Sequence, residues 1–78
     1  MSAALRLHPV PDRAAALEPE LLRLSEVERI VGLRRTAIYR MIGAGQFPRP
    51  IKLQNGRSRW ARRHIQAWVE AQIAASEA

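Results

Sequence analysis

The sequence predicts a mainly α domain in which three helices are accompanied by a two-stranded β-hairpin wing between the second helix and the third. Two observations carry this prediction. Apolar residues recur at three- and four-residue spacing in three separate segments, as they do on the buried face of a helix. The pair Asn55-Gly56 lies between two short alternating runs, which is the strongest short-range signal for a hairpin.

The chain of 78 residues has room for one domain with one modest core, which is expected at residues 21–76. Residues 1–20 are predicted to be a flexible tail or a short partner-dependent segment, because they contain three prolines and an alanine run without sustained periodicity. The chain contains no cysteine, which excludes disulfides and thiolate metal sites. The absence of cysteine and of a signal-like segment favours an intracellular, cytoplasmic setting.

The first helix is expected over about 26–31 and begins at a capping box. In this box the Ser25 hydroxyl would cap the backbone N–H of Glu28, whose carboxylate would reach back. Gly32 is placed to end the helix. The residues expected to be buried are Val27, Ile30 and Val31.

The second helix is expected over about 35–42, after a very tight connection through Gly32 and Leu33. Its buried stripe is predicted to contain Ile38, Met41 and Ile42. The opposite side would carry Arg35, Thr36, Tyr39 and Arg40. Two glycines, Gly43 and Gly45, follow and are expected to end the helix.

A two-residue turn at Asn55-Gly56 fixes the expected register of the hairpin. Ile51 would face Trp60, and Lys52 would face Arg59. The side chains expected to point inward are Ile51, Leu53 and Trp60, and those expected to point outward are Lys52, Arg57 and Arg59. The pair of like charges would weaken an isolated hairpin, and the phosphates of a polyanionic partner would offset that loss.

The last helix is expected over about 62–75, with one mostly apolar face formed by Ile65, Trp68, Val69, Gln72 and Ile73. Both tryptophans and Phe47 are predicted to belong to the core, because aromatic residues at core spacing usually pack inward. Tyr39 is expected at the edge of the core, with its hydroxyl free to reach a phosphate.

The charge distribution points to a polyanionic partner. The formal net charge is +6, and the block from Arg29 to Val69 contains ten basic residues and no acid. Nine of the ten are arginines, which favour bidentate contacts with phosphate and guanine. A basic face that serves only solubility and an anionic membrane surface are the alternatives.

Two short helices joined by a tight turn, followed by a hairpin, make up a winged helix-turn-helix, so double-stranded DNA is the expected partner. Two pairs of arginines at helix starts, Arg34 with Arg35 and Arg62 with Arg63, oppose the helix dipole and would suit phosphates. The predicted phosphate contacts are Arg34, Lys52, Arg59, Arg62 and Arg63. The predicted base-edge contacts are Arg35, Thr36, Tyr39 and Arg40, with Asn55 and Arg57 at the tip of the wing.

Residues Leu21 to about Ser76 resemble the AlpA-like regulators of phages and mobile elements, small relatives of the MerR-type winged helix-turn-helix. The resemblance rests on the segments Leu22 to Val27, Val31 to Leu33, Ile38 to Ile42 and Gly45 to Leu53, and on Trp60 followed by Ile65 to Trp68. It implies that the second helix enters the major groove and that the hairpin touches adjacent backbone or minor groove. It also implies a regulator of integrase genes or an excisionase that bends attachment-site DNA.

Three functions therefore stay open at this stage. They are a transcriptional regulator of a mobile element, an excisionase or recombination directionality factor, and a protein-interaction module such as an antitoxin or adaptor. No catalytic residue, metal site or cofactor is expected, and the protein is predicted not to be an enzyme. Copies are expected to associate along DNA, head to tail or on repeated sites, and an integrase is a further candidate partner. No membrane partner is expected.

Overall fold

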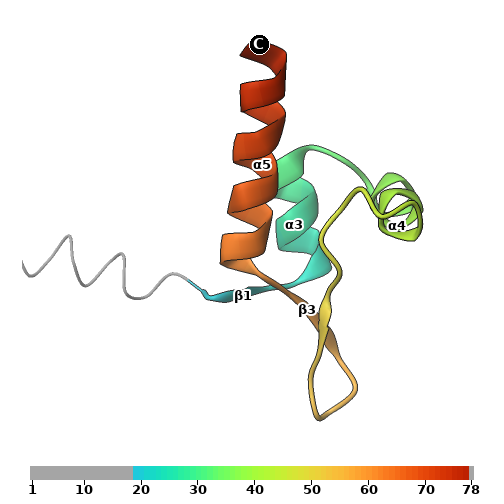
Figure 1. Cartoon of the computed structure of the whole chain (residues 1–78). Coiled ribbons are helices and arrows are strands. Elements are labelled where there is room, and N and C mark those ends of the chain that lie inside the picture. The colour runs from blue at the N-terminus through green and yellow to red at the C-terminus, as the bar shows by residue number, and fades with distance from the viewer. Residues whose placement is uncertain (1–18, 78) are drawn as a thin grey trace, which may run out of the picture.

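A computed structural model of the chain describes residues 19–77, so all but the last two residues of the expected tail lie outside the described part. The elements in chain order are β1 (Leu21–Leu22), α3 (Leu24–Val31), α4 (Arg35–Gly43), β2 (Ile51–Lys52), β3 (Ser58–Ala61) and α5 (Arg62–Glu77). Helix α5 stands beside α3, and α4 lies on the other side of α3 (Figure 1). The hairpin formed by β2 and β3 projects from the body as a wing (Figure 1).

This architecture confirms the predicted winged helix-turn-helix: three helices with a β-hairpin wing. It adds a third strand, because β1 pairs antiparallel with β3 and the sheet has the order β1-β3-β2. Leu21 lies opposite Ala61, and Leu22 lies opposite Trp60. A strand of two residues carries no alternating pattern, which is why the sequence does not reveal it.

Helix α3 begins two residues earlier than expected, and the predicted capping box is wrong. Arg23 is the N-cap residue, and its backbone N–H donates to Glu26 Oε1 at 2.7 Å. Ser25 therefore lies inside the first turn of the helix, where it cannot cap. The end of the helix is as expected: Gly32 has a φ of 74°, and its N–H donates to the Glu28 carbonyl at 2.9 Å.

Helix α4 ends in a hydrogen-bonded glycine motif. The Gly45 N–H donates to the Ile42 carbonyl at 3.0 Å, and the Gln46 N–H donates to the Met41 carbonyl at 2.8 Å. This is the bond pattern of a Schellman motif, with Gly45 in the left-handed region at a φ of 73°. The chain thereby leaves α4 sharply and returns across the core through Phe47.

The predicted register of the hairpin is wrong by one residue. Ile51 lies opposite Arg59, and Lys52 lies opposite Ser58. The Leu53 N–H donates to the Arg57 carbonyl at 2.8 Å, so the loop has three residues instead of two. Gly56, with a φ of 86°, provides the left-handed residue that closes such a loop.

The core lies where α3, α4, α5 and β3 meet, and its buried members are Leu22, Val27, Ile38, Ile42, Phe47, Trp60 and Ile65. The core role predicted for Phe47 and Trp60 is confirmed, and Trp68 packs against the same cluster. Among the residues predicted to be buried, Ile30 is 47% exposed and Ile51 is 40% exposed. Ile73 is also exposed, in the distal part of α5.

Candidate nucleic-acid interface

The outer face of α4 gathers the four side chains that were predicted to contact base edges. Ile38 is completely buried and Ile42 nearly so, which fixes the rotation of the helix about its axis. The residues left exposed include Arg35, Thr36, Tyr39 and Arg40. The helix therefore presents two guanidinium groups, a hydroxyl and a phenol to solvent, as donors and acceptors for base edges and phosphates.

The ring of Tyr39 is held in place by the core although 42% of the residue is exposed. It meets Trp60 edge to face, with 6.2 Å between the ring centroids and 69° between the ring planes. Trp60 is itself fixed, because its indole N–H donates to the Pro48 carbonyl at 3.0 Å. The face of α4 is thereby joined to the base of the wing, so the two surfaces are presented in a defined relative position.

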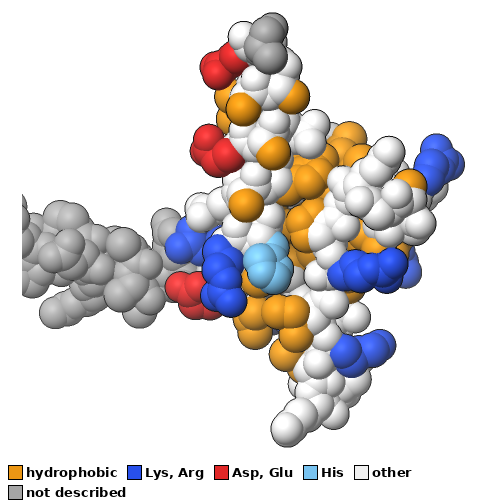
Figure 2. Space-filling view, viewed as in Figure 1, with side chains coloured by type: hydrophobic (Ala, Val, Ile, Leu, Met, Phe, Trp, Pro, Cys, Tyr) orange, Lys and Arg blue, Asp and Glu red, His pale blue; other side chains and the backbone are white. Residues whose placement is uncertain are grey.

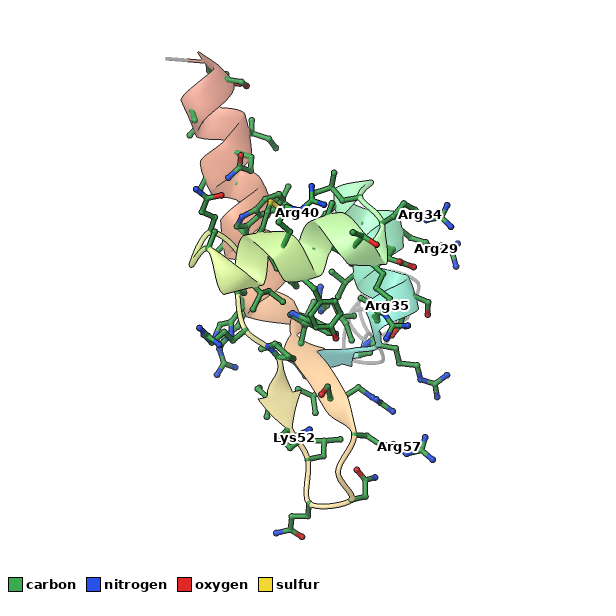
Figure 3. All side chains as sticks on the ribbon, turned by 90° about the vertical axis from the view of Figure 1, so that its right-hand side faces the viewer. Arg29, Arg34, Arg35, Arg40, Lys52 and Arg57 are labelled. Carbon is green, nitrogen blue, oxygen red and sulfur yellow. The ribbon has the colours of Figure 1, made fainter. Side chains whose placement is uncertain are left out.

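Cations from three parts of the chain lie along one side of this face. Figure 3 looks onto α4, with Arg34 and Arg35 at the N-terminal end of the helix and Arg29 of α3 beside them. Arg57 extends from the wing on the same side, and Lys52 lies at the other edge of the hairpin (Figure 3). In the view of Figure 2, Lys and Arg side chains lie over α4 and the wing, and acidic side chains lie over α5 and beside β1.

At the start of α4, neither a side-chain cap nor an acidic residue balances the free backbone N–H groups and the helix dipole. Arg34 is the N-cap residue and makes no side-chain cap hydrogen bond, and the first turn contains no acid. Its backbone N–H groups and the two adjacent arginines together form a site that suits an anion. Sequence reasoning placed Arg34 and Arg35 here, but it did not include Arg29 among the predicted DNA contacts, although Arg29 belongs to the basic block.

The wing differs from expectation in a way that matters for its charges. Lys52 faces Ser58, so the predicted pair of like charges across the hairpin does not exist. Arg59 lies opposite Ile51 and donates from its guanidinium to the Ser58 carbonyl at 2.8 Å. The Asn55 side chain accepts a hydrogen bond from the Arg57 N–H at 2.9 Å, which makes Asn55 a residue that shapes the turn.

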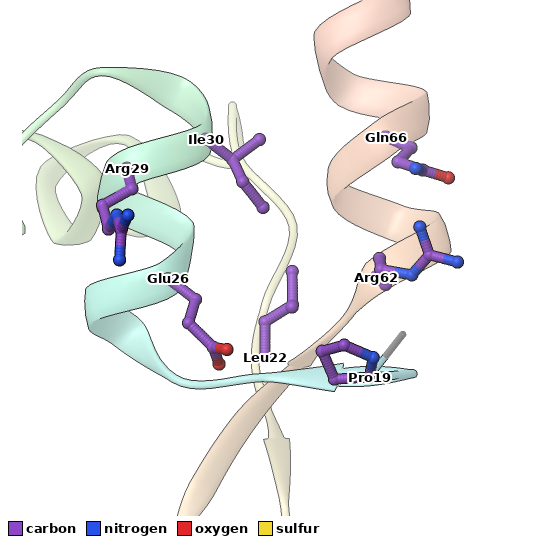
Figure 4. Close-up of a pocket in the computed structure, with 7 residues that line it drawn as sticks. All are labelled: Pro19, Leu22, Glu26, Arg29, Ile30, Arg62 and Gln66. Atoms are coloured by element: carbon purple, nitrogen blue, oxygen red, sulfur yellow. The ribbon is translucent and has the colours of Figure 1, made fainter. Parts of the chain in front are cut away.

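The two arginines at the start of α5 are not gathered with α4. Arg62 is half-buried and lines a groove between α3 and α5 together with Glu26 and Arg29 (Figure 4). Its backbone N–H donates to the Glu20 carbonyl at 2.8 Å. Arg63 is exposed at the same end of α5. Arg49 is exposed too, and nothing in the structure assigns it a role.

The groove between α3 and α5 is a second surface feature, which sequence reasoning missed because Ile30 was expected to be buried. Its lower part is lined by Pro19, Leu22, Glu26, Arg29, Ile30, Arg62 and Gln66 (Figure 4). An adjoining hollow is lined by Ile30, Gln66, Ala67, Val69 and Glu70. No residue of α4 or of the wing lines either hollow. Exposed apolar surface is therefore found in this groove, at Ile30, as well as at Ile73 near the end of α5.

Within residues 19–77, two other structural features are absent. No group of three or more His, Cys, Asp or Glu side chains in this part of the chain is placed to hold a metal ion. Among the same residues, no helix is both long enough and apolar enough to cross a membrane.

The fold and the polar, cationic face of its second helix define a winged helix-turn-helix domain. Comparison with known families gives the membership: residues 20–73 match the family described as prophage CP4-57 regulatory protein (AlpA). The chain belongs to this AlpA family of phage regulatory proteins. It is 34% identical over 68 residues to the protein named "Uncharacterized protein ORF88" of Enterobacteria phage P4, a span of 87% of this chain and 74% of the phage protein. No solved structure gives a significant match.

Proposed function

We propose that the protein is a sequence-specific, double-stranded DNA-binding transcriptional regulator of a phage or an integrative mobile element. The observation that carries this proposal is the face of α4, where Arg35, Thr36, Tyr39 and Arg40 are all exposed on the side away from buried Ile38. Membership of a phage regulatory family supports it. Residues 21–76 would form the DNA-binding domain.

In this proposal α4 enters the major groove, where its exposed side chains contact base edges. Arg34 at the start of the helix and Arg29 beside it bind phosphates of the flanking backbone. The wing lies against the neighbouring backbone or minor groove, with Lys52, Arg57 and Arg59 as its cationic contacts. Arg62 and Arg63 remain candidate phosphate contacts at the start of α5.

The salt dependence of binding tests the proposal. If each copy neutralises about six phosphates, the logarithm of the association constant should fall with the logarithm of salt concentration at a slope of about −5. Fluorescence anisotropy with the purified full chain and labelled duplex measures this slope. Binding that is independent of salt would contradict the proposal. A footprint across the upstream region of its own gene and any adjacent attachment site then locates the preferred sequence.

Variants of the α4 face separate DNA contacts from changes in folding. Arg40→Ala should weaken duplex binding about 5- to 150-fold, since a base-edge contact of an arginine contributes about 1–3 kcal/mol. Gln72→Ala is the control, because Gln72 is exposed on α5 and belongs neither to α4 nor to the wing. Equal affinities of the two variants would count against the α4 face as the interface.

A second candidate function, an excisionase that bends attachment-site DNA, is favoured by one feature of the wing. Ile51 is 40% exposed, and its cross-strand neighbour is Arg59. Exposed apolar side chains flanked by arginines are typical of proteins that enter the minor groove and kink the duplex. Energy transfer between dyes at the two ends of a bound duplex distinguishes the functions: a bend of several tens of degrees that is lost in Ile51→Ser supports the architectural role, and an unbent duplex excludes it.

We also propose that several copies bind side by side along DNA, because one module with few phosphate contacts has low affinity on its own. Stepwise extension of the footprint with rising protein concentration is the expected result. A footprint of one isolated site at saturation would contradict this. The integrase as partner is testable by co-purification of the two proteins on attachment-site DNA.

A further inference from the structure

A shallow hollow on the outer face of α4 is lined by Arg35, Thr36 and Tyr39. The three side chains come together because residues three and four apart lie on the same face of a helix. The apolar groups of its lining residues are the phenol ring of Tyr39 and the methyl group of Thr36, and both residues also carry a hydroxyl. Arg35, in the first turn of α4, contributes a guanidinium.

The apolar side formed by Tyr39 is rigid before any ligand arrives. The ring meets Trp60 edge to face at 6.2 Å, and Trp60 is 1% exposed and hydrogen-bonded to the Pro48 carbonyl. The ring cannot turn away without losing this contact. A preformed wall loses little conformational entropy on binding, so it discriminates well between groups of different shape.

We propose that this hollow binds the C5-methyl group of a pyrimidine in the major groove, while Arg35 binds a guanine in the adjacent base pair. The inference rests on the proposed DNA-binding function and adds the chemistry of the site it prefers. The C5-methyl is the apolar group that a base edge offers in the major groove, and guanine offers two acceptors, O6 and N7, to one guanidinium. Thymine and 5-methylcytosine both carry the methyl group.

Other base edges fit this hollow less well. Adenine is usually bound by the amide of Asn or Gln, and the amino group of cytosine by a carboxylate. The lining contains neither an amide nor an acid. A phosphate would accept hydrogen bonds from Arg35 and from the Thr36 and Tyr39 hydroxyls, and this mode of binding would give equal affinities for thymine and deoxyuridine.

The first experiment selects preferred sites from a random-sequence duplex pool with the full chain. A thymine beside a G·C pair is expected at a fixed position of the selected sequence. Deoxyuridine then replaces that thymine, which removes only the methyl group. The affinity should fall about fourfold, the factor that corresponds to about 0.8 kcal/mol for one buried methyl-sized group. Cytosine and 5-methylcytosine are also compared at this position, to test whether the methyl group of 5-methylcytosine is bound as that of thymine is. A duplex with the methylated base should then bind about fourfold more tightly than one with cytosine.

Matched variants of Thr36 locate the effect in the hollow. Thr36→Ser keeps the hydroxyl and removes the methyl group, so the difference between thymine and deoxyuridine should shrink below about twofold. Thr36→Val keeps the methyl group and removes the hydroxyl, so the full difference should persist. Tyr39→Phe keeps the ring and should also preserve the difference.

Three outcomes would overturn the inference. They are selected sites without a thymine next to a guanine, equal affinities for thymine and deoxyuridine at every thymine of the site, and a full methyl effect in Thr36→Ser. In each of these cases salt-dependent duplex binding would leave the proposed function standing. A chain that binds no duplex at all would overturn both.

Discussion

The indole N–H of Trp60 donates to the backbone carbonyl of Pro48 at 3.0 Å, which ties β3 to the segment that leaves α4. A parallel bond runs from the indole N–H of Trp68 on α5 to the Gln46 carbonyl, also at 3.0 Å. Phe47 lies between these two anchored carbonyls and packs against Trp68 at 4.9 Å between ring centroids. The two tryptophans therefore hold the connection between the helix-turn-helix and the wing.

The two anchors should differ in strength. Trp60→Phe should lower the free energy of unfolding by about 2 kcal/mol, because it removes a partly buried hydrogen bond and leaves a void in the core. Trp68→Phe should cost about 1 kcal/mol or less, since its bond to Gln46 is exposed to solvent. Chemical denaturation followed by circular dichroism measures both. The reverse order of the two losses would contradict the structure.

The glycine that ends α4 provides a second prediction. Gly45→Ala should destabilise the fold by about 1–2 kcal/mol, because Gly45 has a φ of 73° and an alanine is strained there. Gly43→Ala is the matched control, in the same helix end but without a positive φ. It should leave stability unchanged or raise it by up to about 1 kcal/mol. Similar losses in both variants would show that the helix ends elsewhere.

Two isoleucines test the placement of the core. Ile38 is completely buried, whereas Ile30 is 47% exposed in the groove between α3 and α5. Ile38→Ala should cost about 2–5 kcal/mol, and Ile30→Ala less than about 1 kcal/mol. Equal losses in thermal or chemical unfolding would mean that Ile30 is covered in solution.

The register of the wing makes a further prediction about charge. Because Lys52 faces Ser58 and Arg59 faces Ile51, a carboxylate at position 52 has no cross-strand partner in Arg59. A double-mutant cycle of Lys52→Glu and Arg59→Ala should therefore give a coupling energy below about 0.3 kcal/mol. A clearly stabilising coupling energy would contradict this register and support the one predicted from the sequence, in which residue 52 faces Arg59.

The contrast between helices and hairpin shows what can be predicted from this sequence. The periodicity of Ile38, Met41 and Ile42 predicts the rotation of α4 and hence the face carrying Arg35 and Tyr39, because burial enforces a period that local sequence displays. Gly32 likewise predicts the end of α3. These features depend on residues that are close together in the chain.

The features that were not predicted have two causes. Either two local conformations of similar free energy fit the same residues, or the conformation depends on contacts between residues that are distant in the sequence. Asn55-Gly56 fits a two-residue turn, yet the glycine closes a three-residue loop and the asparagine caps it from within. The N-cap residue of α3 is Arg23 and not the predicted Ser25, because β1 pairs with β3 and this pairing fixes where the chain enters the helix. The separation of Arg62 from the α4 face depends on how α5 continues from β3, where the Arg62 N–H donates to the distant Glu20 carbonyl, and no local pattern encodes this contact.

The last prediction separates two adjacent arginines at the start of α4. Arg34 precedes the helix as its N-cap residue, whereas Arg35 is in the first turn and lines the hollow with Thr36 and Tyr39. Arg34→Ala should weaken binding to all duplexes by a similar factor and make the salt slope shallower by about 1, as expected for a lost phosphate contact. Arg35→Ala should instead reduce the preference for the selected sequence over an unrelated duplex, by about 1–3 kcal/mol. Anisotropy titrations of both variants on the two duplexes at several salt concentrations measure these differences. A uniform loss in Arg35→Ala would assign that residue to the backbone and would leave base recognition to Thr36, Tyr39 and Arg40.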